Sequence, residues 1–149
     1  MRNLRKIIQE EGNKIVNKCY QCGECGSVCT IGYVRKEYSP RKIIYELIIG
    51  NEDIFESEML WWCAGCHLCS ETCSKNVEPE EILIIARNYA CKSDNRCPGR
   101  IRMMADSILK NGAVLPVIGR AERYRGEMNL NPIKKVDVEE IRKITNFRR

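Results

Sequence analysis

Apolar residues recur along this chain at the spacing of helices, and no stretch alternates for long with the period of two that marks a strand. The clearest helix is predicted after Ser39, which suits an N-cap, and Pro40, which suits the first helical position. Gly50 marks its end. Its apolar face contains four residues at helical spacing: Ile43, Ile44, Leu47 and Ile48.

A second helix is predicted to start at Pro79, where Glu80 and Glu81 place negative charge at the positive end of the helix dipole. Its apolar positions are Ile82, Ile85, Ala86 and Tyr89. A third helix is predicted to open at Pro98-Gly99 and to close at Gly112. Its inward positions are Ile101, Met104, Ile108 and Leu109.

The two ends of the chain carry shorter helical patterns. Leu4, Ile7, Ile8 and Ile15 predict an opening helix, interrupted near Gly12. Asp137 is predicted to cap a last helix that carries Val138, Ile141 and Ile144. Residues 113–125 are the least regular segment, and Pro116 argues against a strand there.

These patterns predict an all-α protein. A length of 149 residues fits a single domain over 1–149. We expect a core over 15–92 and a C-terminal helical extension over 93–149. The composition, 44% hydrophobic and 30% charged, is that of an ordinary globular chain and argues against disorder.

Ten cysteines are the unusual feature of the composition. No apolar run approaches the roughly 18 residues of a membrane span, and the first residues lack the apolar stretch of a secretory signal. We therefore expect a cytoplasmic protein without a membrane anchor. Thiols stay reduced in that compartment, so the cysteines predict metal ligation or redox chemistry before disulfides.

Eight of the cysteines form two runs with identical C-x2-C-x2-C-x3-C spacing. The first run contains Cys19, Cys22, Cys25 and Cys29, and the second contains Cys63, Cys66, Cys69 and Cys73. This is the bacterial-ferredoxin spacing for [4Fe–4S] clusters, in which one loop reaches three corners of the cube. Each run precedes a helix that begins with proline, so the chain contains an internal repeat with two related halves.

In two-cluster proteins the fourth ligand comes from the other run. We therefore predict one cluster on Cys19, Cys22, Cys25 and Cys73, and a second on Cys63, Cys66, Cys69 and Cys29. Zinc ribbons use separated pairs of ligands, so a zinc-dependent nucleic-acid module is the least favoured alternative. Gly23, Gly26, Ala64 and Gly65 are small enough for the backbone to approach a cluster closely.

The clusters change the meaning of the charge. The formal net charge is +5. Eight thiolates and two oxidised cores bring it to about +1. The basic excess thus offsets the cofactors and does not predict nucleic-acid binding. Arg120, Arg123 and Arg125 form a local basic patch, which is either a solvated loop or a docking point for an acidic partner.

Other residues have weaker signals. His67, the single histidine, sits inside the second run and has no obvious catalytic partner, although it is placed to tune the neighbouring cluster. Trp61 and Trp62 are expected to pack over the second cluster, or else to form a partner surface. Cys91 and Cys97 are left over and are expected to be incidental.

The runs also depart from the ferredoxin pattern. Thr30 and Ser74 replace the usual proline after the fourth cysteine. Local capping by their hydroxyls is the favoured expectation, and a hydrogen bond to a cluster sulfur, which would shift the reduction potential, is the alternative.

With these motifs the chain resembles the C-type iron–sulfur subunit of heterodisulfide reductase from methanogenic archaea. The resemblance rests on Cys19-Tyr20-Gln21-Cys22-Gly23-Glu24-Cys25, on Leu60-Trp61-Trp62-Cys63 and on the helical spacer between the runs. It implies an α-helical ferredoxin-like dicluster domain with additional N- and C-terminal helices, and it implies that the eight motif cysteines are the functional residues.

The resemblance further implies a non-catalytic subunit of an oxidoreductase complex. Such a subunit passes electrons from a flavin-containing A-type subunit to a catalytic B-type subunit, which reduces the mixed disulfide of coenzyme M and coenzyme B in methanogenesis. A larger assembly with a hydrogenase or formate dehydrogenase belongs to the same expectation. No catalytic residue or substrate site is expected on this chain, because no phosphate loop, nucleotide fingerprint or hydrolytic triad is present.

Three other iron–sulfur roles stay open from the residues alone. A free ferredoxin would need far less chain than 149 residues. The iron–sulfur subunit of a fumarate or succinate enzyme would carry a further C-x4-C-x2-C motif, which is absent here. A relay in a related thiol–disulfide complex would use the same eight cysteines.

Overall fold

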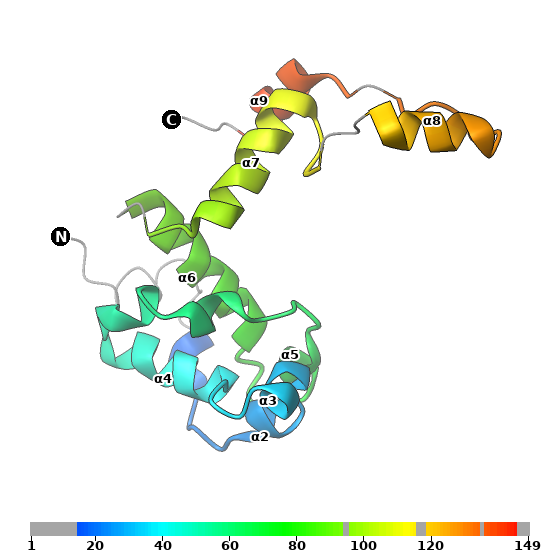
Figure 1. Ribbon diagram of the computed structural model, residues 1–149. Coiled ribbons are helices and arrows are strands. Elements are labelled where there is room, and N and C mark those ends of the chain that lie inside the picture. Colours follow the sequence, from blue (N-terminus) through cyan, green and yellow to red (C-terminus); the bar gives the residue numbers. More distant parts are fainter. Residues whose placement is uncertain (1–14, 94–95, 116–118, 135, 146–149) are drawn as a thin grey trace. The chain divides into compact units, whose positions relative to one another are not determined.

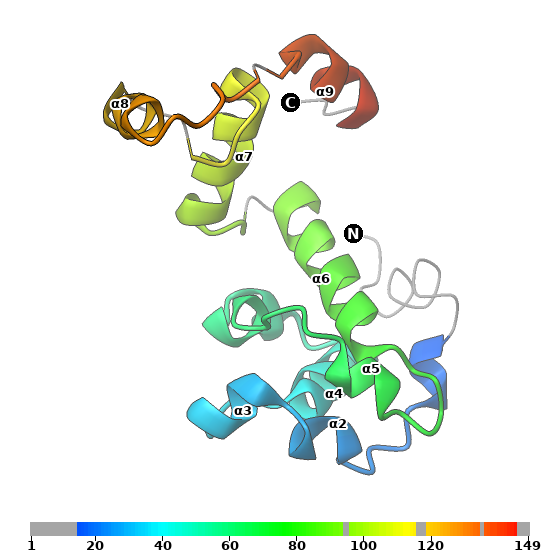
Figure 2. The same ribbon diagram turned by 90° about the vertical axis from the view of Figure 1, so that its right-hand side faces the viewer.

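The computed structural model describes residues 15–93, 96–115, 119–134 and 136–145, and these residues form helices and turns without a strand (Figures 1 and 2). The predicted all-α class is therefore confirmed. The chain divides into two compact units, residues 1–96 and residues 97–149. The opening helix predicted from Leu4 onward lies mostly outside the described residues.

The first unit contains both cysteine runs. Its α-helices are α2 (Glu24–Ser27), α3 (Thr30–Val34), α4 (Pro40–Ile49), α5 (Leu68–Glu71) and α6 (Pro79–Ser93). Three 3₁₀-helices join them: Ile15–Lys18, Glu52–Phe55 and Glu58–Trp61. The short helices α2 and α5 lie side by side, and the longer helices α4 and α6 pack against each other (Figures 1 and 2).

The core of the first unit forms where α4 meets α6. Ile43, Leu47 and Ala86 are fully enclosed there, each at 0% exposure. Burying a side chain such as isoleucine or leucine stabilises the fold by roughly 1.5–3 kcal/mol. The predicted apolar faces of both helices are confirmed, with Ile48, Ile85 and Tyr89 packed at the edge of the core.

The ends of α4 also follow the sequence. Pro40 is the first helical residue after the N-cap Ser39, although no hydrogen bond from the Ser39 side chain caps the helix. Gly50 ends the helix in the left-handed conformation with φ 77°, and its N–H donates to main-chain oxygens of the last turn.

The second unit contains α7 (Gly99–Asn111), α8 (Gly119–Glu127) and α9 (Val138–Thr145). Helices α7 and α9 contact each other. None of the described side chains in this unit is fully buried. Met104, predicted to face inward, is 44% exposed. Hydrophobic burial therefore stabilises this unit much less than the first.

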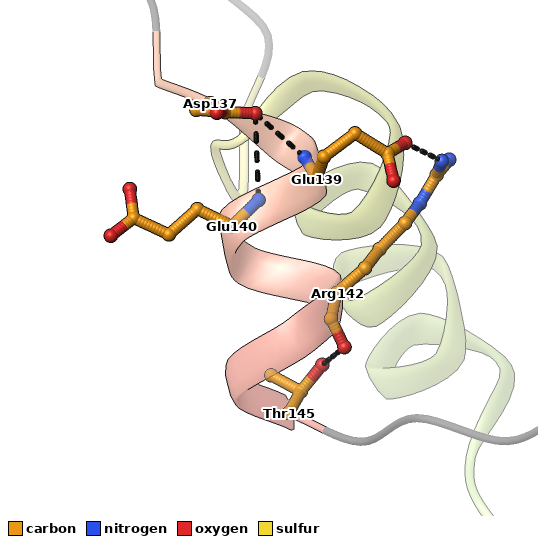
Figure 3. A network of polar contacts seen from close by, with 5 residues as sticks. All are labelled: Asp137, Glu139, Glu140, Arg142 and Thr145. Atoms are coloured by element: carbon orange, nitrogen blue, oxygen red, sulfur yellow. Dashed lines mark hydrogen bonds and ion pairs between the residues drawn. The ribbon is translucent and has the colours of Figure 1, made fainter.

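Helix α9 begins as predicted (Figure 3). The Oδ1 atom of Asp137 accepts hydrogen bonds from the main-chain N–H groups of Glu139 and Glu140, at 2.9 and 3.4 Å. Further along, Arg142 pairs with Glu139, and the Thr145 hydroxyl donates to the oxygen of Ile141. The Asp137 contacts satisfy main-chain N–H groups that the start of the helix leaves unpaired.

Helix α8 was not predicted, and the expectation of irregular structure over 113–125 is wrong for this part. The segment contains three Arg and two Glu among its nine residues, and both residue types favour helices without any apolar periodicity. Arg123 pairs with Glu127 one turn later at 3.5 Å, and Arg120 and Arg123 stack on the ring of Tyr124. A search for apolar spacing overlooks such a polar helix.

Within the described ranges, none of the helices combines the length and the apolar composition needed to cross a bilayer.

Candidate metal centre

The two cysteine runs fold in the same way, which confirms the internal repeat. In each run a left-handed residue follows the first cysteine at the second position: Gln21 with φ 64° and Gly65 with φ 65°. A second left-handed residue follows two positions later, Gly23 with φ 95° and His67 with φ 61°. A short helix then starts, α2 in the first run and α5 in the second. The three leading cysteines of each run thereby line one cavity.

The cysteines line two cavities in the first unit. The first cavity, as we name it, is lined by Cys19, Cys22, Cys25 and Cys73. The second cavity is lined by Cys29, Cys63, Cys66 and Cys69. Each cavity thus combines three cysteines of one run with the last cysteine of the other, and all eight are free. These are the same two sets that were expected from the spacing.

Helices α4 and α6 close the two cavities in a reciprocal way. Pro40 and Leu83 border the second cavity, whereas Pro79 and Ile44 border the first. Each cavity is therefore bordered by the first residue of one long helix and by a residue one turn into the other. The pairing of α4 with α6 is what brings the last cysteine of each run to the opposite loop.

Burial raises the pKa of two of these thiols. For Cys25 the pKa rises to about 11, because the side chain is desolvated and because the thiol of Cys69 lies nearby. Burial likewise raises the pKa of Cys69, with the Cys63 thiol as the next cause. These thiols hold their protons at neutral pH unless a cation replaces them, and thiolate ligands of a metal lose those protons on binding.

Hydrogen-bond donors point at the sulfur atoms of both cavities. In the first cavity the Gln21 side-chain amide donates to Cys19 Sγ at 3.3 Å, and the Val77 N–H donates to Cys73 Sγ at 3.4 Å. In the second, the Gly32 N–H donates to Cys29 Sγ and the Gly65 N–H to Cys63 Sγ, both at 3.4 Å. Donors of this kind stabilise thiolate ligands and tune reduction potentials.

The hydroxyls that replace proline do not act as the local caps we expected. Thr30 Oγ1 lies 3.8 Å from Cys66 Sγ, so its hydroxyl contacts a sulfur of the second cavity. Ser74 Oγ lies 3.4 Å from the hydroxyl of Tyr20. For Thr30 the structure therefore shows the alternative expectation, a contact between the hydroxyl and a cysteine sulfur.

His67 has a partner that the sequence did not reveal. Its Nδ1 lies 3.2 Å from Oε2 of Glu80, whose side chain is only 7% exposed. Both residues line the second cavity. From further along α6, Arg87 donates to the main-chain oxygens of Leu60 and Cys63 at 2.8 and 3.2 Å. Helix α6 therefore fixes the second loop at two points.

The first loop is fixed from α4. Arg41 donates to the main-chain oxygen of Gln21 at 3.5 Å and lines the first cavity. Arg41 and Glu80 are both the second residue of a helix that begins with proline. The repeat in the sequence could have identified them as an equivalent pair, but the sequence pattern assigns Glu80 only to the helix dipole and gives Arg41 no role.

The tryptophans do not border the cavities. Trp61 and Trp62 pack, half-buried, against the hydrophobic core. Trp62 lies 6.5 Å from the ring of Tyr38, and the guanidinium of Arg35 stacks on it at 4.4 Å. Tyr38 itself lines the second cavity, where its buried hydroxyl has no hydrogen-bond partner among the described residues. Burial raises the pKa of this phenol.

The cavities suit a cluster better than a single ion. Within the described ranges, no three His, Cys, Asp or Glu side chains converge as ligands of one metal ion. In a cubane cluster each thiolate binds a different iron atom, so the four ligands surround a volume rather than a point. Four thiols around each cavity have that arrangement, and the unpartnered Tyr38 hydroxyl offers a donor to a sulfide.

Comparison with known families agrees with this chemistry. Residues 15–77, which include both cysteine runs, match the family described as a 4Fe-4S dicluster domain. The match ends before α6, so the C-terminal half of the chain lies outside it.

Three curated relatives extend the similarity over most of the chain. The C 2 iron-sulfur subunit of CoB–CoM heterodisulfide reductase from Methanocaldococcus jannaschii is 31% identical over 91% of this chain and 75% of its own length. The C2 subunit of the H2/formate:CoB–CoM heterodisulfide, ferredoxin reductase of Methanococcus maripaludis is 31% identical over 77% and 61%. The C-type iron-sulfur subunit of the Methanopyrus kandleri CoB–CoM heterodisulfide reductase is 30% identical over 87% and 67%.

Proposed function

The chain belongs to the family of C-type iron–sulfur subunits of heterodisulfide reductase, and from this premise we propose that it is an electron relay with two [4Fe–4S] clusters. The observation that carries the proposal is the pair of cavities, each lined by four free cysteines drawn from both runs. A [4Fe–4S] cluster needs four thiolate ligands, and two-cluster proteins exchange the fourth ligand between runs.

In this proposal Cys19, Cys22, Cys25 and Cys73 hold one cluster, and Cys63, Cys66, Cys69 and Cys29 hold the other. The clusters supply the ability to take up and release one electron each. The chain contributes the thiolates, the N–H donors on their sulfurs and the apolar core behind them. Helices α2 and α5, which contain Cys25 and Cys69, contact each other, and this supports a short separation between the two sites.

The proposed partners are those of the relatives' complex. Electrons would enter from a flavin-containing A-type subunit, and they would pass on to a catalytic B-type subunit that reduces the coenzyme M–coenzyme B heterodisulfide. Disulfide reduction takes two electrons, whereas each cluster delivers one at a time. In this role the chain supplies electrons to the catalytic site of the B-type subunit. The substrate site then belongs to that subunit and not to this chain.

Metal content tests the ligand assignment first. We expect about eight iron and eight sulfide per anaerobically purified chain. The change Cys73→Ser should remove about half of both, because it opens the first cavity only, whereas the neighbouring change Ser74→Ala should leave both unchanged. Zinc without labile sulfide would contradict the proposal.

Native isolation tests the role. The protein should be purified anaerobically from its own cells, and its complex analysed by native mass. Co-isolation with a flavoprotein and a second cysteine-rich protein is the expected result. A lone, cluster-loaded particle near 17.3 kDa would instead identify a free ferredoxin. Heterodisulfide reduction by the isolated, loaded chain would contradict its assignment as a non-catalytic subunit.

A further inference from the structure

The two cavities carry opposite charges at equivalent positions. Arg41, the second residue of α4, lines the first cavity, and Glu80, the second residue of α6, lines the second. The two cysteine loops have closely related backbone folds. The guanidinium beside one cavity and the carboxylate beside the other therefore differ in charge without a matching difference in backbone.

The remaining charged groups in the linings widen the difference. The first cavity is also lined by Lys75 and Glu24, so it has two cations and one carboxylate. The second is lined by the carboxylate of Glu80 and by His67, and Ile31 takes the place equivalent to Lys75. Arg87 donates to the main-chain oxygens of Leu60 and Cys63 in the second loop, but unlike Arg41 it does not line a cavity.

Burial acts in the same direction. Two cysteines of the second cavity, Cys29 and Cys69, are each only 8% exposed. The cysteines of the first cavity are all half-buried or exposed. Adding an electron makes a thiolate-bound cluster more negative, and water stabilises that extra charge less in a buried site.

Hydrogen bonds do not cancel this difference. Each cavity has two N–H donors on its cysteine sulfurs, at 3.3 and 3.4 Å in the first and at 3.4 Å in the second. The second cavity adds the neutral hydroxyls of Thr30 and Tyr38. Neutral dipoles act less strongly on an added electron than whole charges of opposite sign in similar positions.

We propose that Arg41, Lys75 and Glu80 set the direction of the relay: the first site holds an electron more tightly than the second, so electrons enter at Cys29, Cys63, Cys66 and Cys69 and leave through Cys19, Cys22, Cys25 and Cys73. This inference rests on the proposed two-cluster function. In the internal step one electron leaves the second site and enters the first, and no bond or proton changes place.

The test is a redox titration of the full-length, cluster-loaded protein followed by electron paramagnetic resonance. Wild type should show two midpoint potentials. Arg41→Gln and Lys75→Gln should each lower the higher potential and leave the lower one in place, because each removes a cation from the first cavity. Glu80→Gln should raise the lower potential, because it removes a buried negative charge from the second.

Matched controls come from neighbouring residues that do not line either cavity. Lys42→Gln, next to Arg41 on α4, and Glu81→Gln, next to Glu80 on α6, change the net charge equally and should leave both potentials unchanged. Arg41→Lys keeps the charge and should preserve the higher potential. If Glu80→Gln prevents cluster loading, the variants of the exposed residues Arg41 and Lys75 still decide which site has the higher midpoint potential.

Two results would overturn the assignment. In the first, Arg41→Gln shifts the lower of the two midpoint potentials instead of the higher one. In the second, both potentials respond equally to the lining variants and to the control variants. Failure of the proposed function would look different, because the wild-type protein would then lack two [4Fe–4S] signals before any variant is compared.

Discussion

Left-handed residues shape both cysteine loops, and only half of them are glycine. Gly23 and Gly65 are visible in the sequence, whereas Gln21 and His67 adopt the same conformation without that signal. A non-glycine residue there costs about 1–2 kcal/mol. Contacts offset this cost: the Gln21 amide donates to Cys19 Sγ, and His67 pairs with the buried Glu80. Such compensation depends on tertiary neighbours and cannot be predicted from local sequence.

Two helix-ending glycines give a prediction at the residue scale. Gly50 and Gly112 both have positive φ, at 77° and 72°. No atom lies within 4 Å of a Cβ built on Gly50, but the Cβ of Val136 lies 2.7 Å from one built on Gly112. Gly50→Ala should cost about 1 kcal/mol from backbone strain alone. Gly112→Ala should cost its own unit about 1–3 kcal/mol more, through overpacking.

Urea denaturation of the single variants checks both costs. The double variant Gly112→Ala with Val136→Gly separates strain from overpacking, because it removes the crowded Cβ and should recover part of the loss. Equal losses of unfolding free energy in Gly50→Ala and Gly112→Ala would show that Val136 moves aside without cost.

At the scale of elements, the structure supports the predicted helices that have an apolar face or a cap, and it adds one that has neither. Helices α4 and α6 carry periodic apolar residues and begin with proline, and α9 begins after the capping Asp137. Helix α8 instead relies on intrinsic helix propensity and on the Arg123–Glu127 pair. Polar helices lack the periodic signal on which sequence reading depends.

The cap of α9 gives a prediction at this scale (Figure 3). Asp137→Ala removes the acceptor for two main-chain N–H groups and should cost about 1 kcal/mol of stability in the second unit. Circular dichroism should show a loss of helix at a temperature where wild type is folded. Asp137→Asn keeps an acceptor oxygen and should behave almost as wild type, so a loss of the same size in that variant would argue against capping.

At the scale of the whole molecule, cluster binding and basic charge lie in different units. Residues 97–149 contain 12 Lys and Arg against 6 Asp and Glu, whereas residues 1–96 contain 13 against 14. The basic excess therefore offsets the clusters only in the sum over the chain.

This division predicts that the clusters do not need the second unit. A chain shortened to residues 1–96 keeps all eight motif cysteines and every fully buried residue described, so it should bind about as much iron as the full chain. Iron analysis and electron paramagnetic resonance after anaerobic reconstitution check this. A shortened chain that folds but stays empty would show that residues 97–149 help to hold the clusters.

The sequence by itself determined the helical class and the repeat, and it predicted the two sets of four cysteines that we propose as ligands, because helix periodicity and cysteine spacing are local properties that survive in any arrangement of the chain. Only the tertiary structure decided what surrounds those cysteines. The pairing of α4 with α6 brings Arg41 to one cavity and buries Glu80 against His67 at the other. Burial and charge at a site depend on segments far apart in the sequence, so no local pattern encodes them.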